Sequence, residues 1–289
     1  MHRFVLHNDE IRECGDKLLS AGQMGLLGGW GVFSTIRVNS GVLVAFERHW
    51  ARMERDAARL RVPFPSEPDY MRSRLLRLIQ ANHAENATLR VVVVRNGNGK
   101  WAAPGQRDFD LVGLTAELTD WGPAARLAVE PNARFAGSPY GGAKSTSWVL
   151  NLLYLEKAQA GGFDEVVLLN ERGEVSECAS ANLFVCQGSE VWTPPLSSGC
   201  LPGVTRELLL SEVRAEGIAV GERTLHLEDL EQADEVFITS VTRDLLPAAS
   251  IEGLAIRRRG EVRGRLGEAY RRYVEAYVAA QRPPTAGQE

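Results

Sequence analysis

The sequence Glu177-Cys-Ala-Ser-Ala-Asn-Leu-Phe184 lies downstream of Lys144 and is followed by Leu201-Pro-Gly-Val-Thr-Arg206. The first stretch joins a carboxylate to an apolar strand, and the second opens a helix with glycine. Lys144 itself lies among small residues, in Tyr140-Gly-Gly-Ala-Lys-Ser-Thr-Ser147. Such a lysine can hold an aldehyde cofactor as a Schiff base, the carboxylate can pair its ring nitrogen, and the helix start can bind its phosphate. Together these parts predict a pyridoxal phosphate enzyme.

Lys144 taken alone would most simply be a solvated surface lysine. Two features of its surroundings favour a nucleophile instead. The small residues on both sides leave room for a bulky adduct, and reactive lysines occupy sheltered sites of this kind. An apolar helix is predicted directly after it, at about 148–160.

Glu177 ends the turn Glu174-Val-Ser-Glu-Cys178 and precedes the apolar Ala181-Asn-Leu-Phe-Val185. A glutamate on a turn is usually exposed. At the start of a buried strand, however, a carboxylate is also well placed to keep a pyridine nitrogen protonated. The protonated ring then withdraws electrons from a substrate carbanion, which is how pyridoxal phosphate contributes to catalysis.

Two segments are candidates for binding the phosphate. Gly203-Val204-Thr205 begins a helix, whose free N–H groups and positive dipole end attract anions, and the Thr205 hydroxyl adds a donor. Phe237-Ile-Thr-Ser-Val-Thr-Arg243 is a predicted strand that runs into a hydroxyl-rich loop. Taken alone, the first segment is better explained by an ordinary helix N-cap, and the second has low specificity.

Arg52 lies one helical turn beyond His49, so the two share a helix face. A planar guanidinium suits a dianionic phosphate. The alternative is a surface arginine, because the same helix also carries Arg48, Arg55 and Arg59.

Composition limits the classes of function. The chain has 289 residues, of which 44% are hydrophobic and 24% charged, with a formal net charge of −4. The chain has no basic face that could bind a phosphate backbone, so we expect no nucleic acid partner. The longest aliphatic runs, Val91–Val94 and Val166–Leu169, are far too short to span a membrane. Cys14, Cys178, Cys186 and Cys200 form no CxxC pair and the histidines lack metal-ligand spacing, so we expect free thiols, no metal and a cytoplasmic protein.

Hydrophobic periodicity predicts alternating strands and helices. Predicted strands cover 31–38, 42–46, 88–95, 109–116, 126–130, 165–169, 181–187, 190–193, 218–223 and 235–239. Predicted helices cover 47–60, 68–82, 148–160, a segment after Gly203, 227–232 and 263–281. The pattern breaks between Glu117 and Ala124, where Asp120, Gly122 and Pro123 cluster, so we place a domain boundary there, with domains at 1–118 and 119–289.

Several blocks, in this order, resemble the class IV aminotransferases, which are the fold-type IV pyridoxal phosphate enzymes. That family includes branched-chain aminotransferases, D-amino acid aminotransferases and aminodeoxychorismate lyases. The blocks that carry the resemblance are Gly31-Val-Phe-Ser-Thr-Ile-Arg37, His49-Trp-Ala-Arg52, Lys144, Phe163-Asp-Glu-Val166, Gly173-Glu-Val-Ser-Glu177, Ala181-Asn-Leu-Phe184, Leu201-Pro-Gly-Val-Thr-Arg206 and Phe237-Ile-Thr-Ser240. Separate blocks in the right order make a specific signal.

The resemblance implies an α+β fold with a small N-terminal α/β domain and a larger C-terminal domain that has a mainly β core and flanking helices. It implies pyridoxal 5'-phosphate between the domains, and a homodimer. Lys144 would bind the aldehyde and carry the proton between the substrate Cα and the cofactor C4′, and Glu177 would pair the ring nitrogen. The implied phosphate ligands are Arg52, Val204, Thr205, Ser240, Val241 and Thr242.

The sequence departs from the family pattern around the substrate. Ser34 replaces a frequent glutamate, Phe33 replaces a tyrosine of some branches, and Val241 replaces a hydroxyl residue. Many members have an asparagine or a tyrosine soon after the lysine, where this chain has Ser147-Trp148-Val149. The lysine, the glutamate and the arginine are all retained.

We therefore expect a transaminase that moves an amino group between an amino acid, branched-chain-like as the best guess, and a 2-oxo acid. Arg95 and Lys100 are candidates for the substrate carboxylate, and Phe33, Trp101 and Tyr140 for the pocket wall. The loop after Arg95 lacks the basic pair of the D-amino acid enzymes. The alternative is a lyase of the aminodeoxychorismate type, which the Phe33-Ser34-Thr35 run resembles. A cofactor-binding protein without activity is the third hypothesis, and the retained lysine, glutamate and arginine disfavour it.

Overall fold

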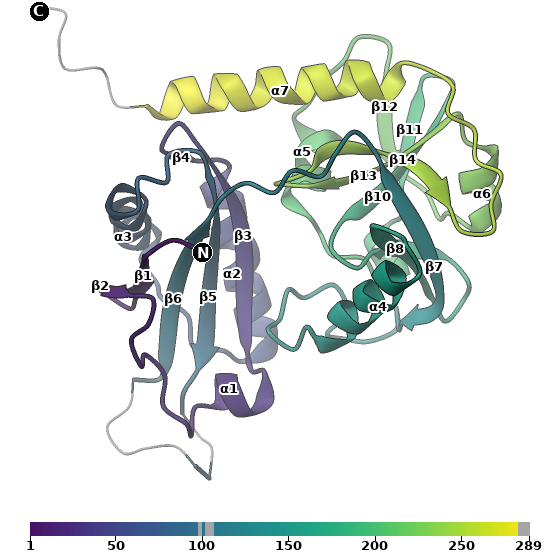
Figure 1. Cartoon of the computed structure of the whole chain (residues 1–289). Coiled ribbons are helices and arrows are strands. Elements are labelled where there is room, and N and C mark those ends of the chain that lie inside the picture. The colour runs from purple at the N-terminus through teal and green to yellow at the C-terminus, as the bar shows by residue number, and fades with distance from the viewer. Residues whose placement is uncertain (98–99, 102–106, 283–289) are drawn as a thin grey trace, which may run out of the picture. The chain divides into compact units, whose positions relative to one another are not determined.

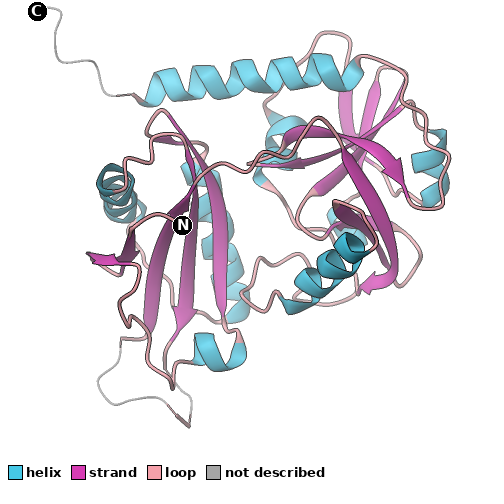
Figure 2. Cartoon of the chain, viewed as in Figure 1, coloured by secondary structure: helices cyan, strands magenta, loops and turns pink. Residues whose placement is uncertain are grey.

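The computed structural model describes residues 1–97, 100–101 and 107–282. The chain divides into two compact units, one formed by Met1–Leu118 together with the chain from Arg271 on, the other by Thr119–Tyr270. Figure 1 shows the elements of both units, and Figure 2 shows that each combines helices with strands. The predicted α+β class is therefore confirmed. Helices long and apolar enough to cross a membrane are absent from the described ranges.

The first unit is a sheet with its two long helices on one face. Its strands are β1 (Phe4–His7), β2 (Glu10–Glu13), β3 (Gly31–Asn39), β4 (Val42–Leu43), β5 (Ala87–Arg95) and β6 (Phe109–Ala116); its helices include α1 (Met24–Gly28), α2 (Phe46–Leu60) and α3 (Pro68–Ala81). The strand order is β2-β1-β6-β5-β3-β4, and the pairings between these strands are antiparallel.

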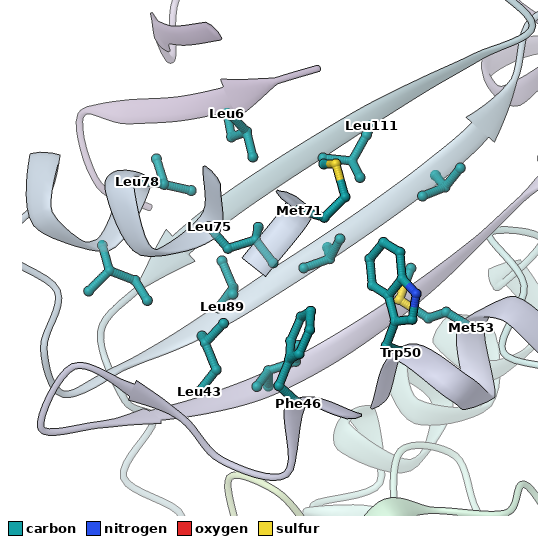
Figure 3. Packing of buried hydrophobic residues seen from close by; sticks show 14 of the residues in the cluster. Leu6, Leu43, Phe46, Trp50, Met53, Met71, Leu75, Leu78, Leu89 and Leu111 are labelled. Carbon is teal, nitrogen blue, oxygen red and sulfur yellow. The ribbon is translucent and has the colours of Figure 1, made fainter. Parts of the chain in front are cut away.

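The core of this unit follows from alternation along β3 and β5. Every second residue of β3, such as Val32 and Ile36, is buried against α2 and α3. Trp50 and Met53 on α2 and Leu75 on α3 fill the space above the sheet (Figure 3). Ser34 falls on the same inward-facing set, so a polar side chain enters an apolar core.

The second unit is built on a mixed sheet with the strand order β12-β11-β10-β13-β14-β7-β8-β9. Its elements are β7 (Ala125–Arg134), α4 (Val149–Ala160), β8 (Glu165–Asn170), β9 (Val175–Cys178), β10 (Asn182–Gln187), β11 (Glu190–Thr193), η1 (Leu196–Ser198), α5 (Val204–Ser211), β12 (Ala219–Glu222), α6 (Leu227–Gln232), β13 (Glu235–Ser240), β14 (Asp244–Ile251) and the start of α7 (Val262–Gln281). Strand β7 is parallel to both of its neighbours, β14 and β8. Phe184 and Phe237 stack at 5.1 Å between ring centroids in its core.

Two predicted boundaries differ from the structure. The strand predicted at 42–46 shrinks to β4, Val42–Leu43, because Ala45 adopts a left-handed backbone (φ 51°) and α2 already begins at Phe46. The domain predicted at 119–289 includes the C-terminal residues from Arg271 on, whereas the structure groups them with the first unit. There Tyr277 donates to Glu47 at 2.8 Å, and Arg72 donates to Gln281 at 2.7 Å.

Besides the three-residue 3-10 helix η1, five elements of the described chain were not predicted: β1, β2, β9, β14 and α1. Four of them have only four or five residues, which is too short for periodicity to separate a strand or helix from a loop. Strand β14 is longer but contains Pro247, a residue that argues against a strand when read from sequence.

Candidate cofactor site

Lys144 lies in the loop that precedes α4, and its ammonium sits 4.6 Å from the centroid of the Trp148 ring. An aromatic face attracts a cation, so the contact orients the side chain. The loop that carries Lys144 also lies close to the backbone at Cys200. A Cβ at Gly142 would lie 2.7 Å from the Cys200 carbonyl oxygen, and Gly142 has a φ of +70°. Glycine at this position therefore allows the lysine loop to pack against the segment that leads into α5.

Glu177 is held from two sides within the second unit. It lies on β9 opposite Leu168 and is 7% exposed. The Arg134 guanidinium donates to its Oε1 at 3.1 Å, and the backbone N–H of Leu201 donates to its Oε2 at 3.0 Å. The carboxylate is thus fixed in direction, and it is tied to the residue that follows Cys200.

Arg134 is a residue that the sequence reasoning missed. It ends β7, where the register with β8 shifts beyond Glu130. Its Nη1 also donates to Asn151 of α4 at 3.4 Å, and the Asn151 amide donates to the Ala179 carbonyl at 2.6 Å. Glu177, the end of β7 and the first turns of the helix after Lys144 therefore form one polar network. In the sequence it lies beyond the strand predicted at 126–130, so no local pattern pointed to it.

The turn before β9 is braced by a second acid. Glu174 accepts hydrogen bonds from Arg172 at 2.7 Å, from Asn170 at 2.8 Å and from Ser198 at 2.8 Å. Arg172, the largest influence, together with Asn170 and Ser198, lowers the pKa of Glu174 to about 2. The turn is therefore rigid on the side from which β9 carries Glu177.

The start of α5 has the features of an anion site. Gly203 caps the helix, and a Cβ there would collide with the Asn182 side chain, whose amide donates to the Leu201 carbonyl at 2.8 Å. Val204 and Thr205 are both 2% exposed. The Thr205 hydroxyl oxygen is buried and makes no hydrogen bond within the described part of the chain. A buried hydroxyl left unsatisfied at a helix N-terminus suits a phosphate oxygen.

The turn between β13 and β14 comes to the same end of the sheet. Asn182 pairs with Thr239 in the β10–β13 register, so Ser240 follows directly beside the residue that anchors α5. The Ser240 and Thr242 hydroxyl oxygens lie 3.3 Å apart. Val241, between them, has no hydroxyl to contribute. The structure thus brings Val204, Thr205 and the 240–242 turn together through one strand pair.

A buried ion pair holds that turn in place. The Arg243 guanidinium donates to Glu165 at 3.2 Å and lies 3.6 Å from the centroid of the Trp121 ring. Glu165 is 0% exposed and also accepts a hydrogen bond from the Ser180 hydroxyl. Burial lowers the pKa of Arg243, while Glu165 opposes that effect. Neither member of the pair was singled out from the sequence.

In the first unit, Arg52 belongs to a buried polar group. Its Nη2 donates to Ser34 at 2.8 Å, and the Ser34 oxygen lies 2.7 Å from His49 Nδ1. All three residues are at most 7% exposed. The predicted sharing of a helix face by His49 and Arg52 is confirmed, because both reach the same serine.

The predicted substrate residues are more scattered. Arg95 donates to the Arg61 carbonyl at 2.7 Å and lies over the Trp30 ring, so its guanidinium is bound to this unit's own backbone. Lys100 lies over Trp101 at 5.3 Å, and Trp101 and Tyr140 are 65% and 60% exposed. Residues 98–99 and 102–106, in the loop after Arg95, fall outside the described residues.

Arg90 is a cation that the sequence reasoning missed. Strand register places it opposite Thr35, on the face of the sheet away from α2. Its guanidinium lies 4.2 Å from the centroid of the Phe33 ring. Burial lowers its pKa, and the described residues offer it no ion-pair partner.

A lysine in a small-residue loop, a clamped carboxylate and a helix start with an unsatisfied hydroxyl fit pyridoxal phosphate. Comparison with known proteins agrees. Residues 31–251 match the family described as amino-transferase class IV. The chain belongs to the class IV aminotransferase family and is a pyridoxal-phosphate-dependent transaminase.

Individual relatives are distant but cover the chain well. A putative branched-chain-amino-acid aminotransferase of Methanocaldococcus jannaschii is 29% identical over 89% of this chain and 91% of its own length. A D-alanine aminotransferase of Bacillus licheniformis is also 29% identical, over 87% and 89%. A solved branched-chain amino acid aminotransferase from Escherichia coli is 25% identical and covers 93% of this chain and 93% of its own, with a TM-score of 0.84.

The fold extends to a lyase as well. A putative 4-amino-4-deoxychorismate lyase from Legionella pneumophila is 24% identical, with a TM-score of 0.82 over 90% of this chain and 96% of its own. At this identity the likeness concerns the fold alone.

Proposed function

We propose that this transaminase moves the amino group between an amino acid with a branched apolar side chain and a 2-oxo acid, in a ping-pong cycle. The observation that carries the proposal is the clamp on Glu177 by Arg134 and the Leu201 N–H, in the same unit as Lys144. Relatives named as branched-chain enzymes support the donor, as does the apolar Phe33 ring on the sheet face beside Arg90.

Each residue has a distinct role in this proposal. Bound pyridoxal phosphate supplies a ring that withdraws electrons from the substrate Cα. Glu177 holds a proton on the ring nitrogen, and Lys144 moves the proton between Cα and C4′. The phosphate ligands are Arg52, the N–H groups of Val204 and Thr205, the Thr205 hydroxyl and the turn formed by Ser240, Val241 and Thr242.

An absorption titration tests the donor. The purified protein is expected to show a visible band that a branched-chain amino acid bleaches without an acceptor and that the matching 2-oxo acid restores. A panel of L- and D-amino acids identifies both the side chain and the stereoisomer that is used. Bleaching by D-alanine alone would contradict the proposed donor, and the absence of a band after reconstitution with pyridoxal phosphate would contradict the cofactor site itself.

We further propose that Arg90, not Arg95, binds the substrate carboxylate. Arg90 is an exposed residue whose guanidinium lies over the Phe33 ring with no described carboxylate beside it, so it is available to an anionic ligand, whereas the Arg95 guanidinium is bound to a backbone carbonyl. An Arg90→Met variant is expected to raise KM for donor and acceptor by about 10- to 100-fold, the value of a charge-assisted hydrogen bond, and to change kcat less.

The matched variant for this comparison is Arg95→Met, measured with the same two substrates. It removes an arginine from the same strand. A larger rise in KM for Arg95→Met than for Arg90→Met would reverse the assignment.

A lyase that releases pyruvate from an aminodeoxychorismate-type substrate is the second candidate. The Phe33-Ser34-Thr35 run resembles that branch, and alternation along β3 places Thr35 on the same sheet face as Phe33. The two reactions differ in whether an acceptor is needed. Turnover of such a substrate with pyruvate release and no added 2-oxo acid would establish the lyase and exclude the ping-pong cycle as the main reaction.

We also propose a homodimer. Helix α4 exposes Val149, Leu150, Leu152 and Leu153 by 52–61%, and contiguous exposed aliphatic residues on a helix are typical of an interface. A Leu150→Glu variant is expected to shift the protein to a 31.7 kDa monomer in light scattering, whereas Glu156→Gln on the same helix leaves the dimer unchanged. A wild-type monomer would refute this proposal.

We also propose that the protein is cytoplasmic. Cys178, Cys186 and Cys200 are buried free thiols, and burial raises the pKa of Cys200 to about 12. Thiols kept protonated in this way suit a reducing compartment. Recovery of the protein outside the cytoplasmic fraction of its host would contradict this location.

A further inference from the structure

The proposed phosphate ligand Arg52 does not stand alone in the core of the first unit. Ser34 occupies an inward-facing position of β3, between Val32 and Ile36, and is 0% exposed. A hydroxyl at such a position is costly unless it is hydrogen-bonded. It is satisfied by Arg52 Nη2 at 2.8 Å and by His49 Nδ1 at 2.7 Å.

The direction of these hydrogen bonds follows from the chemistry of the three groups. A guanidinium only donates, so the Ser34 oxygen accepts from Arg52. The Ser34 proton can then point to His49 Nδ1, which accepts it if the ring proton is on Nε2. Hydrogen bonds aligned in one direction strengthen one another in a buried site. With His49 in this tautomer, the three groups form an ordered relay from Arg52 through Ser34 to His49.

We propose that Ser34 and His49 are positioning residues that hold the Arg52 guanidinium in the orientation in which it binds the cofactor phosphate. This inference rests on the proposed role of Arg52. A long arginine side chain loses rotamer freedom when it binds a ligand, and a buried hydrogen bond that fixes it beforehand removes part of that cost. The bond to Ser34 uses one of the five N–H donors of the guanidinium.

Helix α2 keeps the two partners of Ser34 in fixed positions. His49 and Arg52 are one turn apart on α2, and the neighbouring Trp50 and Met53 pack into the core of the unit. Both partners of Ser34 are therefore carried by one rigid element, and Ser34 by the strand beneath it. Movement of the guanidinium would require either the relay or this packing to break.

The test compares two ligands that differ only in the phosphate. The Kd of the apo-protein is measured for pyridoxal phosphate and for pyridoxal, both of which can react with Lys144. Ser34→Ala is expected to raise the Kd for pyridoxal phosphate about tenfold and to leave the Kd for pyridoxal within about twofold, because only the first ligand needs Arg52. Ser73→Ala, which removes an exposed hydroxyl of α3, serves as the matched control.

A double-mutant cycle makes the coupling explicit. Arg52→Ala is expected to weaken pyridoxal phosphate more than Ser34→Ala does, and adding Ser34→Ala to Arg52→Ala should change the Kd by less than about twofold. The positioning role is overturned if Ser34→Ala weakens both ligands equally, if it leaves pyridoxal phosphate binding intact, or if its effect persists without Arg52. Failure of the wild-type protein to bind either ligand would instead overturn the proposed cofactor site, and the positioning role with it.

Discussion

Replacing Lys144 with alanine is expected to remove the visible absorption band and to lower transamination by at least about 10⁴-fold. One amine has two roles in the proposed mechanism, since it binds the aldehyde covalently and moves the proton between Cα and C4′. Loss of positioned acid–base catalysis alone costs up to about 10⁴-fold. Absorption spectra and single-turnover rates of the wild type and the variant provide the measurement.

Lys157 offers the matched control for Lys144. It lies on α4, close along the chain, but its ammonium pairs with Glu130 at 2.7 Å and its side chain is 72% exposed. Lys157→Ala is expected to keep both the band and the rate. A small primary amine added to the Lys144→Ala variant should restore part of the rate, because it can take up the missing proton transfer. Retention of the band in Lys144→Ala, or its loss in Lys157→Ala, would contradict the assignment.

The parts of this fold that were predictable are those whose pattern is local. The helix after Lys144 and the strand at 235–239 appear within a residue or two of the expected bounds, because apolar spacing alone determines them. Thr205 could be named because it stands in the first turn of a predicted helix, and Glu177 because it precedes the strand predicted at 181–187, although the structure places it within the short strand β9. Their roles as cofactor ligands remain predictions.

The residues that escaped prediction depend on contacts between distant segments. Arg134 meets Glu177 only because β7 and β9 both flank β8, and Arg243 meets Glu165 through the order of the sheet. In the sequence, Ser34 was notable only because it replaces the usual glutamate. The structure shows that its side chain points from β3 toward α2, where it contacts Arg52 and His49. Periodicity shows which face of a strand a side chain takes, but not which distant segment lies against it, so these pairings required the structure.

Replacing Glu177 with glutamine is expected to lower kcat by about 10²- to 10³-fold while the visible band is retained. The amide keeps the size of the side chain and can still accept from the Leu201 N–H, but it carries no charge to hold a proton on the ring nitrogen. Loss of one preorganised electrostatic group in an active site costs this much in other enzymes. The rates of the two half-reactions, followed by the change in absorption, give the measurement.

Glu174→Gln separates this effect from a general loss of negative charge near the turn. Glu174 lies three positions earlier, and its partners Arg172, Asn170 and Ser198 brace the turn instead of facing Arg134. Because its pKa is lowered to about 2 in the folded protein, its charge stabilises the fold above about pH 4.5, and that stability is lost as the pH falls toward 2. Glu174→Gln should therefore lower the free energy of unfolding at neutral pH and spare kcat. Glu177→Gln should lower kcat, because the proton on the ring nitrogen loses its counter-charge, and it should also cost stability, because the Arg134 guanidinium loses its charged partner. Equal losses of kcat in the two variants would show that Glu177 acts through the fold and not on the cofactor.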